Sequence, residues 1–261
     1  MKPLTEKLVR MIRWIASLRI PVYAAHAGYF VILAAFPTLV LLLGLLRYTG
    51  LQVQTLTGLL EGFLPQALMP AARKLIRSAY ENTSGAVLSL SAVTGLWSAG
   101  RGIYGLLTGL NGVYGVTENR GWFRTRLLCG LYALGFLLVL VATLVLHVFG
   151  VALFPPGTGG ALHRLRFFIL LGLQTALFAG IFTVLPNRKN RFRDSLPGAF
   201  LASSGWLVFS DLYSFYVEHF AAYANVFGSV YGVALSMLWL YFCICILFYG
   251  GALNRYLSTG T

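Results

Sequence analysis

Few residues in this chain are of the types that catalyse reactions or hold metal ions. The 261 residues include seven acidic side chains, four histidines and three cysteines. The histidines are scattered, with no HxH or HExxH pattern, and no pair of carboxylates has the spacing of metal ligands. No serine stands in a GxSxG turn. This pattern predicts a protein that is not an enzyme and that uses no metal and no cofactor.

Two charged residues stand out because they lie inside apolar sequence: Arg101 and Asp211. An arginine near the middle of a membrane-spanning helix costs at least ~2.5–3.5 kcal/mol on insertion scales, so it is expected to face the protein interior or a wet cavity. The expected depths of the two residues are similar, and we expect Arg101 to pair with Asp211 at a functional centre that binds substrate. The alternative is that Arg101 bonds backbone carbonyls and Asp211 faces the outer head groups.

Six long apolar runs would position these residues. A bilayer core of ~30 Å needs about 20 helical residues, and each run is near or above this length. The composition agrees, since 58% of the residues are hydrophobic and 10% are charged. The runs predict an all-α, polytopic membrane protein with six transmembrane helices in a single membrane domain, residues 1–261. The expected spans are Val22–Leu46, Ala86–Leu110, Leu127–Val151, Phe167–Leu185, Leu196–Val217 and Val230–Leu253.

The sequence outside the runs predicts two further helices. Residues 4–18 have apolar side chains at helical spacing and basic ones elsewhere, which predicts an amphipathic N-terminal helix on the membrane surface. Residues 68–80 predict a short helix in the outer loop between spans one and two, which either rests on the bilayer or covers a cavity. Within the second run, a stripe of glycines predicts close helix packing. The stripe consists of Gly102, Gly105, Gly109 and Gly112.

The chain has a net charge of +13, and its basic residues are unevenly spread. If the chain begins in the cytoplasm, thirteen of its 20 lysines and arginines lie in the inner segments, which include the loops 111–126 and 186–195. This excess follows the positive-inside rule and predicts that both termini are cytoplasmic. No segment outside the runs is long enough for a soluble nucleic-acid-binding domain, so membrane lipids are the expected partners rather than nucleic acid.

Three asparagines lie at the expected cytoplasmic ends of spans two, four and six: Asn111, Asn187 and Asn254. Together with Arg188 and Arg191, they are expected to receive an anionic head group at a mouth between the helices. The alternative is that each asparagine simply caps the C-terminus of its helix.

Several short segments carry a resemblance that extends from about Arg19 to Asn254. These segments are Tyr29–Pro37, Leu96–Ala99 with Leu110–Asn111, Leu185–Asn187 with Pro197–Ala199, and Phe227–Ser229 with Leu238–Tyr241. Their order and spacing resemble the YihY/virulence factor BrkB family. One position differs, because the last span in that family tends to end Gly-Ala-Glu-Leu-Asn and this chain has Ala252 in place of the glutamate.

The resemblance implies a multi-pass protein of the bacterial cytoplasmic membrane, in a family with some members labelled ribonuclease BN-like. The clustered ligands that metal-dependent phosphodiester cleavage needs are missing from this sequence. The resemblance, Arg101 and the proline at Pro37 inside span one favour a transporter of lipid or another amphipathic, anionic envelope substrate. The alternative is an envelope scaffold or assembly factor without transport, because no cluster of ion-coupling carboxylates is evident.

Overall fold

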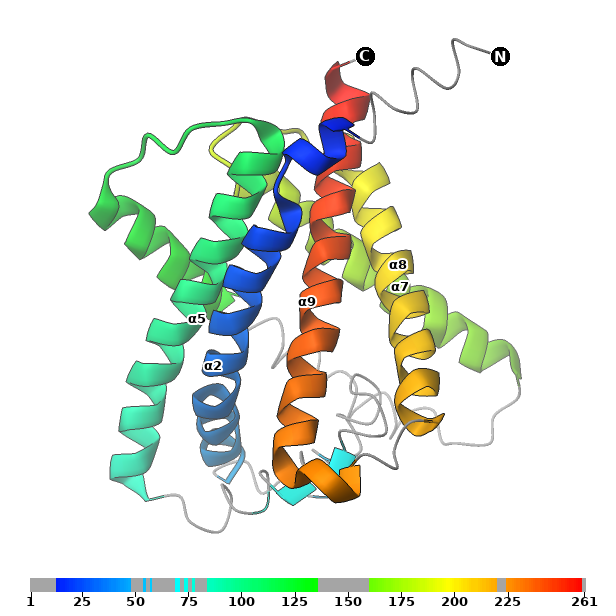
Figure 1. Ribbon diagram of the computed structural model, residues 1–261. Coiled ribbons are helices and arrows are strands. Elements are labelled where there is room, and N and C mark those ends of the chain that lie inside the picture. Colours follow the sequence, from blue (N-terminus) through cyan, green and yellow to red (C-terminus); the bar gives the residue numbers. More distant parts are fainter. Residues whose placement is uncertain are drawn as a thin grey trace.

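The computed structural model describes residues 13–47, 54, 57, 69–70, 73–74, 77, 84–135, 160–219 and 224–259. The regular secondary structure of these residues is entirely helical, as predicted. Figure 1 shows α2, α5, α8 and α9 running side by side, with α7 steeply inclined to them. Residues 13–19 and the end of α9 lie at the same end of this bundle.

The helices agree closely with the expected spans. Five of the six spans correspond to a helix of the structure, and in the third, residues 122–135 are helical while the rest of the span lies outside the described residues. The helices that correspond to whole spans are α2 (Ile20–Arg47), α5 (Gly85–Tyr114), α7 (Gly160–Val184), α8 (Phe192–His219) and α9 (Ala224–Thr259).

One described helix is long and apolar enough to cross a membrane. The segment Gly232–Ser258 of α9 has a mean hydropathy of 2.1, and only 33% of its most apolar stretch is buried. Two shorter apolar stretches are also present, Ile20–Ala34 in α2 and Leu171–Val184 in α7. Large apolar side chains are exposed on several helices, with Val93 69% and Leu212 63% exposed. An exposed apolar surface of this kind is typical of a protein that contacts lipid or a partner.

The two helices expected outside the spans lie mostly beyond the described residues. Residues 13–17, at the end of the expected amphipathic helix, are helical, and the ring of Trp14 lies 6.3 Å from that of Tyr256. Arg19, between this segment and α2, has a φ of 50°. In the expected outer-loop helix, residues 69–70, 73–74 and 77 are helical.

The glycine stripe of α5 packs closely against neighbouring helices, as predicted. A Cβ atom on Gly105 would lie 2.7 Å from the Cα atom of Ala27 in α2. One on Gly109 would overlap the ring of Phe248 in α9. These positions therefore need glycine because the neighbours occupy the volume that a side chain would take.

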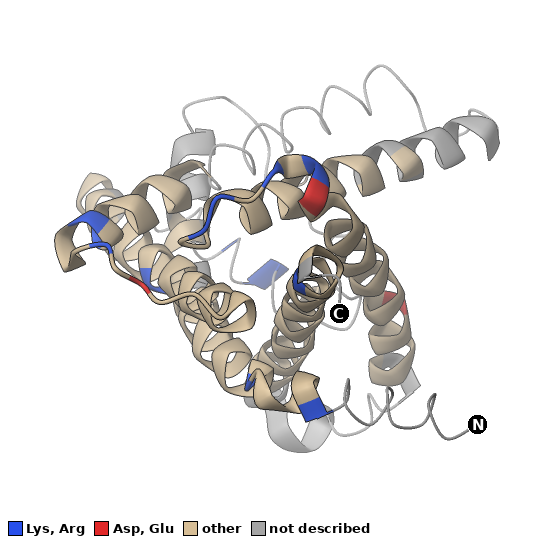
Figure 2. Ribbon diagram, turned by 90° about the horizontal axis from the view of Figure 1, so that it is seen from above, with Lys and Arg blue, Asp and Glu red and all other residues tan. Residues whose placement is uncertain are grey.

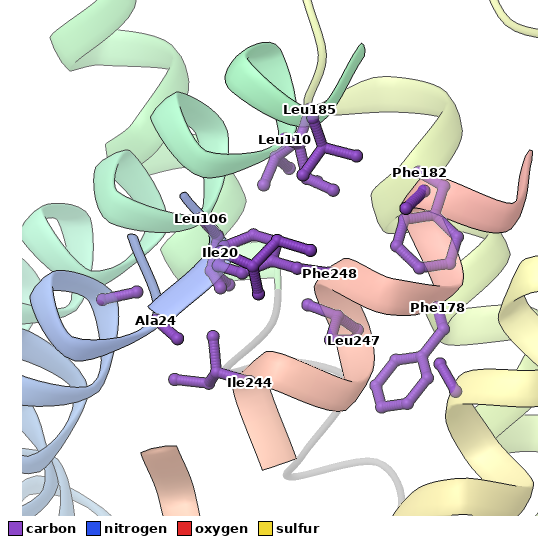
Figure 3. Packing of buried hydrophobic residues seen from close by; sticks show 14 of the residues in the cluster. Ile20, Ala24, Leu106, Leu110, Phe178, Phe182, Leu185, Ile244, Leu247 and Phe248 are labelled. Carbon is purple, nitrogen blue, oxygen red and sulfur yellow. The ribbon is translucent and has the colours of Figure 1, made fainter. Parts of the chain in front are cut away.

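The apolar core lies where α2, α5, α7, α8 and α9 meet. Leu107, Phe182 and Phe248 are completely buried there, and Figure 3 shows the last two with side chains from the surrounding helices. The three cysteines, Cys129, Cys243 and Cys245, are free and buried. They therefore pack as small apolar residues and form no disulfide.

The backbones of α8 and α9 approach each other closely at two glycines. A Cβ on Gly198 would overlap the carbonyl oxygen of Gly250, and a Cβ on Gly250 would overlap that of Gly198. The two helices therefore cross almost without intervening side chains near the start of α8.

Candidate functional site

The segments expected to be cytoplasmic lie together at one end of the bundle. This end contains residues 13–19, the loop after α5, the loop between α7 and α8, and the end of α9 (Figure 1). Viewed from this side, lysines and arginines follow the loops (Figure 2). We call the polar residues that hold these segments together the polar latch. They are Asn111, Glu118, Arg120, Asn187 and Asn254.

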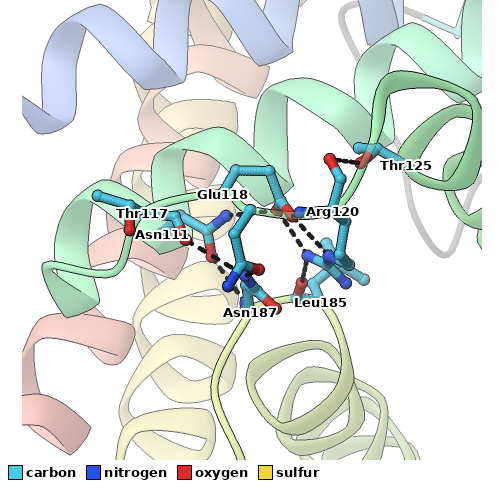
Figure 4. Close-up of polar contacts among 8 residues, drawn as sticks. Asn111, Thr117, Glu118, Arg120, Thr125, Leu185 and Asn187 are labelled. Atoms are coloured by element: carbon cyan, nitrogen blue, oxygen red, sulfur yellow. Dashed lines mark hydrogen bonds and ion pairs between the residues drawn. The ribbon is translucent and has the colours of Figure 1, made fainter.

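The first contact of the polar latch joins α5 to the loop after α7. The backbone N–H of Asn187 donates to Oδ1 of Asn111 over 2.8 Å, and Nδ2 of Asn111 donates to Glu118 over 2.9 Å (Figure 4). Nδ2 of Asn187 donates to the carbonyl of Thr117 and to Oδ1 of Asn119. Two loops that are far apart in the sequence are therefore held together by amide groups.

The second contact is an ion pair within the loop after α5. Nε of Arg120 donates to Oε1 of Glu118 over 2.6 Å and Nη2 donates to Oε2 over 2.7 Å, a two-pronged arrangement that is the strong form of this interaction. Nη2 also donates to the carbonyl of Leu185. The hydrogen bond from Arg120 is the main reason that the pKa of Glu118 lies below its ordinary value.

This ion pair was not predicted from the sequence, although the sequence contains a sign of it. Glu118 is one of only seven acidic residues, and it stands two residues before Arg120 in a short loop between two helices. Counting the loop's basic residues alone, as the positive-inside rule does, overlooks the acidic residue that orders it.

We expect the Glu118→Gln variant to be less stable than the parent at neutral pH by about 1 kcal/mol. The loss is this small because water weakens the attraction between Glu118 and Arg120. Because the pKa of Glu118 is lowered in the folded protein, its contribution is present above the ordinary pKa of 4.5 and is lost as the pH falls through the lowered value. The difference in melting temperature between parent and variant should therefore shrink on acidification. Arg120→Gln should behave in the same way. A difference that is equal at pH 3 and pH 7 would contradict this assignment.

The third contact joins α9 to the first turns of α8. Asn254 is 97% buried, since its exposed fraction is 3%. The N–H of Gly198 donates to Oδ1 of Asn254 over 2.7 Å, and Nδ2 of Asn254 donates to the carbonyl of Ser195 over 3.1 Å. Asn254 therefore stabilises the close crossing of α8 and α9.

The side chains of Asn111 and Asn254 bond other segments and do not cap their own helices, so the capping alternative is wrong for these two residues. The cap of α5 is Gly115, which adopts a left-handed conformation with a φ of 66°. Its N–H donates to the carbonyl of Gly112, and the N–H of Val116 donates to that of Asn111. The side chain of Asn111 is thus free to bond a different segment of the chain.

The arginines expected at the mouth lie at the rim of the polar latch. Arg188 donates to Oγ of Ser258 over 3.3 Å, and its Cζ atom lies 5.5 Å from the ring centre of Tyr114. Arg191 is exposed. The structure thus brings Asn111 and Asn187 into direct contact, whereas Asn254 bonds α8 and the two arginines line the surface.

The ion pair that the sequence predicts between Arg101 and Asp211 is not formed in the described part of the chain. Arg101 is exposed, and its Cζ atom lies 5.6 Å from the ring centre of Phe30 and 5.8 Å from that of Trp97. Asp211 is exposed on α8. The two helices have different main neighbours, because α5 packs on α2 and α9 while α8 packs on α7 and α9.

Comparison with known proteins agrees with this architecture. Residues 11–260 match the virulence factor BrkB family. The chain belongs to this family. Over 243 residues, the BrkB-family chain is 29% identical to the "Putative ribonuclease-like protein YfkH" of Bacillus subtilis (strain 168), covering 90% of this chain and 88% of the relative.

Other relatives are named for the membrane. A "UPF0761 membrane protein" of Tolumonas auensis is 26% identical over 238 residues, which is 85% of this chain and 76% of the relative. Another, from Vibrio campbellii, is 23% identical over 246 residues, which is 92% of this chain and 78% of the relative. No solved structure matches. The chain is therefore a membrane protein of the BrkB family, and its exposed apolar helices fit this assignment.

Two of the segments that carried the family resemblance contact the polar latch. Leu185–Asn187 contacts Asn111, and Pro197–Ala199 contacts the end of α9. Ala252, in place of the acid of the family pattern, is 4% exposed and packs in the apolar core. Among the residues that the structure describes, no three His, Cys, Asp or Glu side chains gather in a group suited to a metal ion.

Proposed function

We propose that this BrkB-family protein crosses the bacterial cytoplasmic membrane six times, with both termini on the cytoplasmic side. The basic loops, residues 13–19 and the end of α9 lie at one end of the bundle, which supports this arrangement (Figures 1 and 2). The positive-inside rule then assigns that end to the cytoplasm.

A labelling experiment tests this topology. Lys189 is exposed in the loop between α7 and α8, and the three native cysteines are buried. In intact cells, a cysteine in the Lys189→Cys variant should react with a membrane-impermeant maleimide only after the membrane is permeabilised. Labelling in intact cells at the rate of a known periplasmic cysteine would overturn the topology.

The function that the geometry supports best is transport of a lipid or another amphipathic, anionic envelope substrate. The observation that carries this proposal is Arg101. It lies 13 residues before the end of α5, about 20 Å along the helix axis, and is exposed there with aromatic rings as its neighbours. A cation at such a depth in a membrane protein is a candidate contact for a substrate or ion.

The polar latch and its arginines support the same proposal at the cytoplasmic end. Arg188 and Arg191 provide positive charge at the rim, which attracts an anionic head group. The amides of Asn111, Asn187 and Asn254 fix the loops and helix ends around this rim, because their hydrogen bonds are made within the protein. The substrate contacts in this proposal are thus the arginines, and the asparagines shape the mouth.

Reconstitution into liposomes tests transport. A fluorescent anionic phospholipid in the inner leaflet becomes accessible to an external quencher only when it is moved across the bilayer. The parent should accelerate this exchange over empty liposomes, and Arg101→Gln should slow it about tenfold, the effect of losing ~1.4 kcal/mol of contact energy. Arg124→Gln, which removes an exposed charge elsewhere, is the control. Exchange by the parent at the rate of empty liposomes would refute transport and favour a scaffold.

A further inference from the structure

Two arginines contact the ring of one tryptophan on α5. Trp97 and Arg101 lie one turn apart on α5, and the Cζ atom of Arg101 is 5.8 Å from the ring centre. The Cζ atom of Arg126, on the helix of residues 122–135, is 4.2 Å from the same ring centre. Two positive charges from different helices are therefore held at one aromatic ring, an arrangement that cation–π attraction stabilises.

The charge of this pair is not balanced within the described part of the chain. Arg101 has the aromatic rings of Phe30 and Trp97 as neighbours, and neither arginine forms an ion pair with a described acidic residue. Nη2 of Arg126 is buried and has no hydrogen-bond partner. A buried donor without an acceptor is unfavourable, so a ligand that offers an acceptor to this nitrogen would gain a hydrogen bond there.

The contact of Arg126 with Trp97 differs from the position that the sequence predicts for Arg126. The sequence places Arg126 in a cytoplasmic loop just before the third span, whereas the structure brings its guanidinium to a ring 17 residues before the end of α5. That distance is about 26 Å along the helix. The sequence gives no sign of this contact, because no pattern of spacing links Trp97 with Arg126.

The chemistry of the two side chains selects the type of ligand. A guanidinium that lies over an aromatic ring uses its face for that contact and keeps N–H groups at its edge for an anion. Phosphate and carboxylate oxygens match this edge, and two guanidinium groups favour a group with several anionic oxygens, such as a phosphate. The exposed apolar side chains around the site, such as Val93 and Leu90, suit an acyl chain.

We propose that Arg101 and Arg126 together bind the phosphate head group of an anionic amphiphile, with Trp97 holding both guanidinium groups in place. This inference rests on the proposed function, whose substrate class it names. The arginines contact the ligand, and Trp97 is a positioning residue. A lipid carries its phosphate to this depth because its acyl chains remain in the bilayer, whereas free phosphate would need a path through water.

Native mass spectrometry of the full chain, taken from nanodiscs, tests this site. The probes are phosphatidic acid, phosphatidylcholine and inorganic phosphate, each added in increasing amounts. The parent should retain phosphatidic acid at least tenfold more tightly than phosphatidylcholine. Arg101→Gln and Arg126→Gln should each weaken this retention about tenfold, and Arg124→Gln should leave it unchanged. Inorganic phosphate that binds as tightly as phosphatidic acid would overturn the assignment to a lipid.

Conservative variants guard against a loss of folding. Arg126→Lys keeps the charge but not the two-pronged geometry, so it should retain phosphatidic acid at a level between those of the parent and Arg126→Gln. Trp97→Phe keeps an aromatic ring and should bind more tightly than Trp97→Ala. Equal binding by the parent and both glutamine variants would refute the site.

The outcomes for binding and transport are separable. Loss of lipid binding in the arginine variants without any lipid transport by the parent would support the site and refute the transporter. Transport by the parent that both glutamine variants retain, with unchanged lipid binding, would refute the site and leave the transporter standing.

Discussion

Replacing Gly198 with alanine is expected to destabilise the protein by about 3 kcal/mol, because the helices α8 and α9 then have to separate. The new Cβ would overlap the carbonyl oxygen of Gly250 and lie 2.6 Å from the side-chain amide of Asn254. A carbonyl in a helix backbone cannot rotate away as the end of a flexible side chain can. Melting temperature and the yield of monodisperse protein measure the effect.

A glycine with open space around it provides the matched control. A Cβ on Gly180 in α7 would have no described atom within 4 Å apart from its chain neighbours and the nearby backbone of its own helix. Gly180→Ala should therefore be neutral or stabilising, by up to about 1 kcal/mol from helix propensity. If Gly198→Ala melts at the same temperature as Gly180→Ala, the close crossing of α8 and α9 does not exist in the protein.

The Asn254→Ala variant should lose about 3 kcal/mol of stability, because two buried hydrogen bonds between α9 and α8 disappear together. The N–H of Gly198 and the carbonyl of Ser195 lose their partners on Asn254. Leaving a buried backbone group without a partner costs ~1–3 kcal/mol. Thermal unfolding of the purified variant gives the measurement.

A serine on the same helix serves as the control for this variant. The hydroxyl of Ser236 donates to the carbonyl of Gly232 within α9, so Ser236→Ala removes no contact between helices. It should change the stability by less than 1 kcal/mol. The double variant Gly198→Ala, Asn254→Ala should lose less than the sum of the two single changes, since removing the amide also removes part of the overlap. Strict additivity would show that the two residues do not touch.

The places of α2, α5, α7, α8 and α9 could be predicted from the sequence, although α7 begins at Gly160 and not at Phe167, and α9 extends six residues further at each end than expected. An apolar run of this length, bounded by charged or turn-forming residues, would be exposed to water unless it spanned the membrane. Few other assignments are therefore open for such a run. The loop 186–195 was expected between spans four and five, and the structure has residues 185–191 between α7 and α8. The close packing of the glycine stripe was predictable because only small residues let helix backbones approach in lipid.

The pairing of helices could not be predicted in the same way. The stripe identifies the face of α5 that packs closely, but nothing in it names Ala27 and Phe248 as the partners. Arg101 was expected to pair with Asp211 because Asp211 has the opposite charge at a similar expected depth, and the sequence does not show which helices are neighbours. The structure instead places aromatic rings beside Arg101, and aromatic residues are too numerous in this chain to single out one partner.

The asparagines of the polar latch were found from the sequence, although their bonds were not. Polar residues at the ends of apolar runs are conspicuous, which is why Asn111, Asn187 and Asn254 stood out. Whether such a residue bonds its own helix or another segment depends on how the ends are brought together. That is a property of the packed bundle and not of local sequence.

The order of synthesis gives the position of Asn254 a consequence in time. The ribosome makes α2, α5 and α8 before α9, and α9 contacts all three of them. Until α9 has been made, Gly109 lacks the ring of Phe248 and the first turns of α8 lack Asn254. The contacts of the earlier helices are therefore incomplete during synthesis, and a chain that stops shortly before Asn254 would be unable to form the hydrogen bonds between α8 and α9 at that residue.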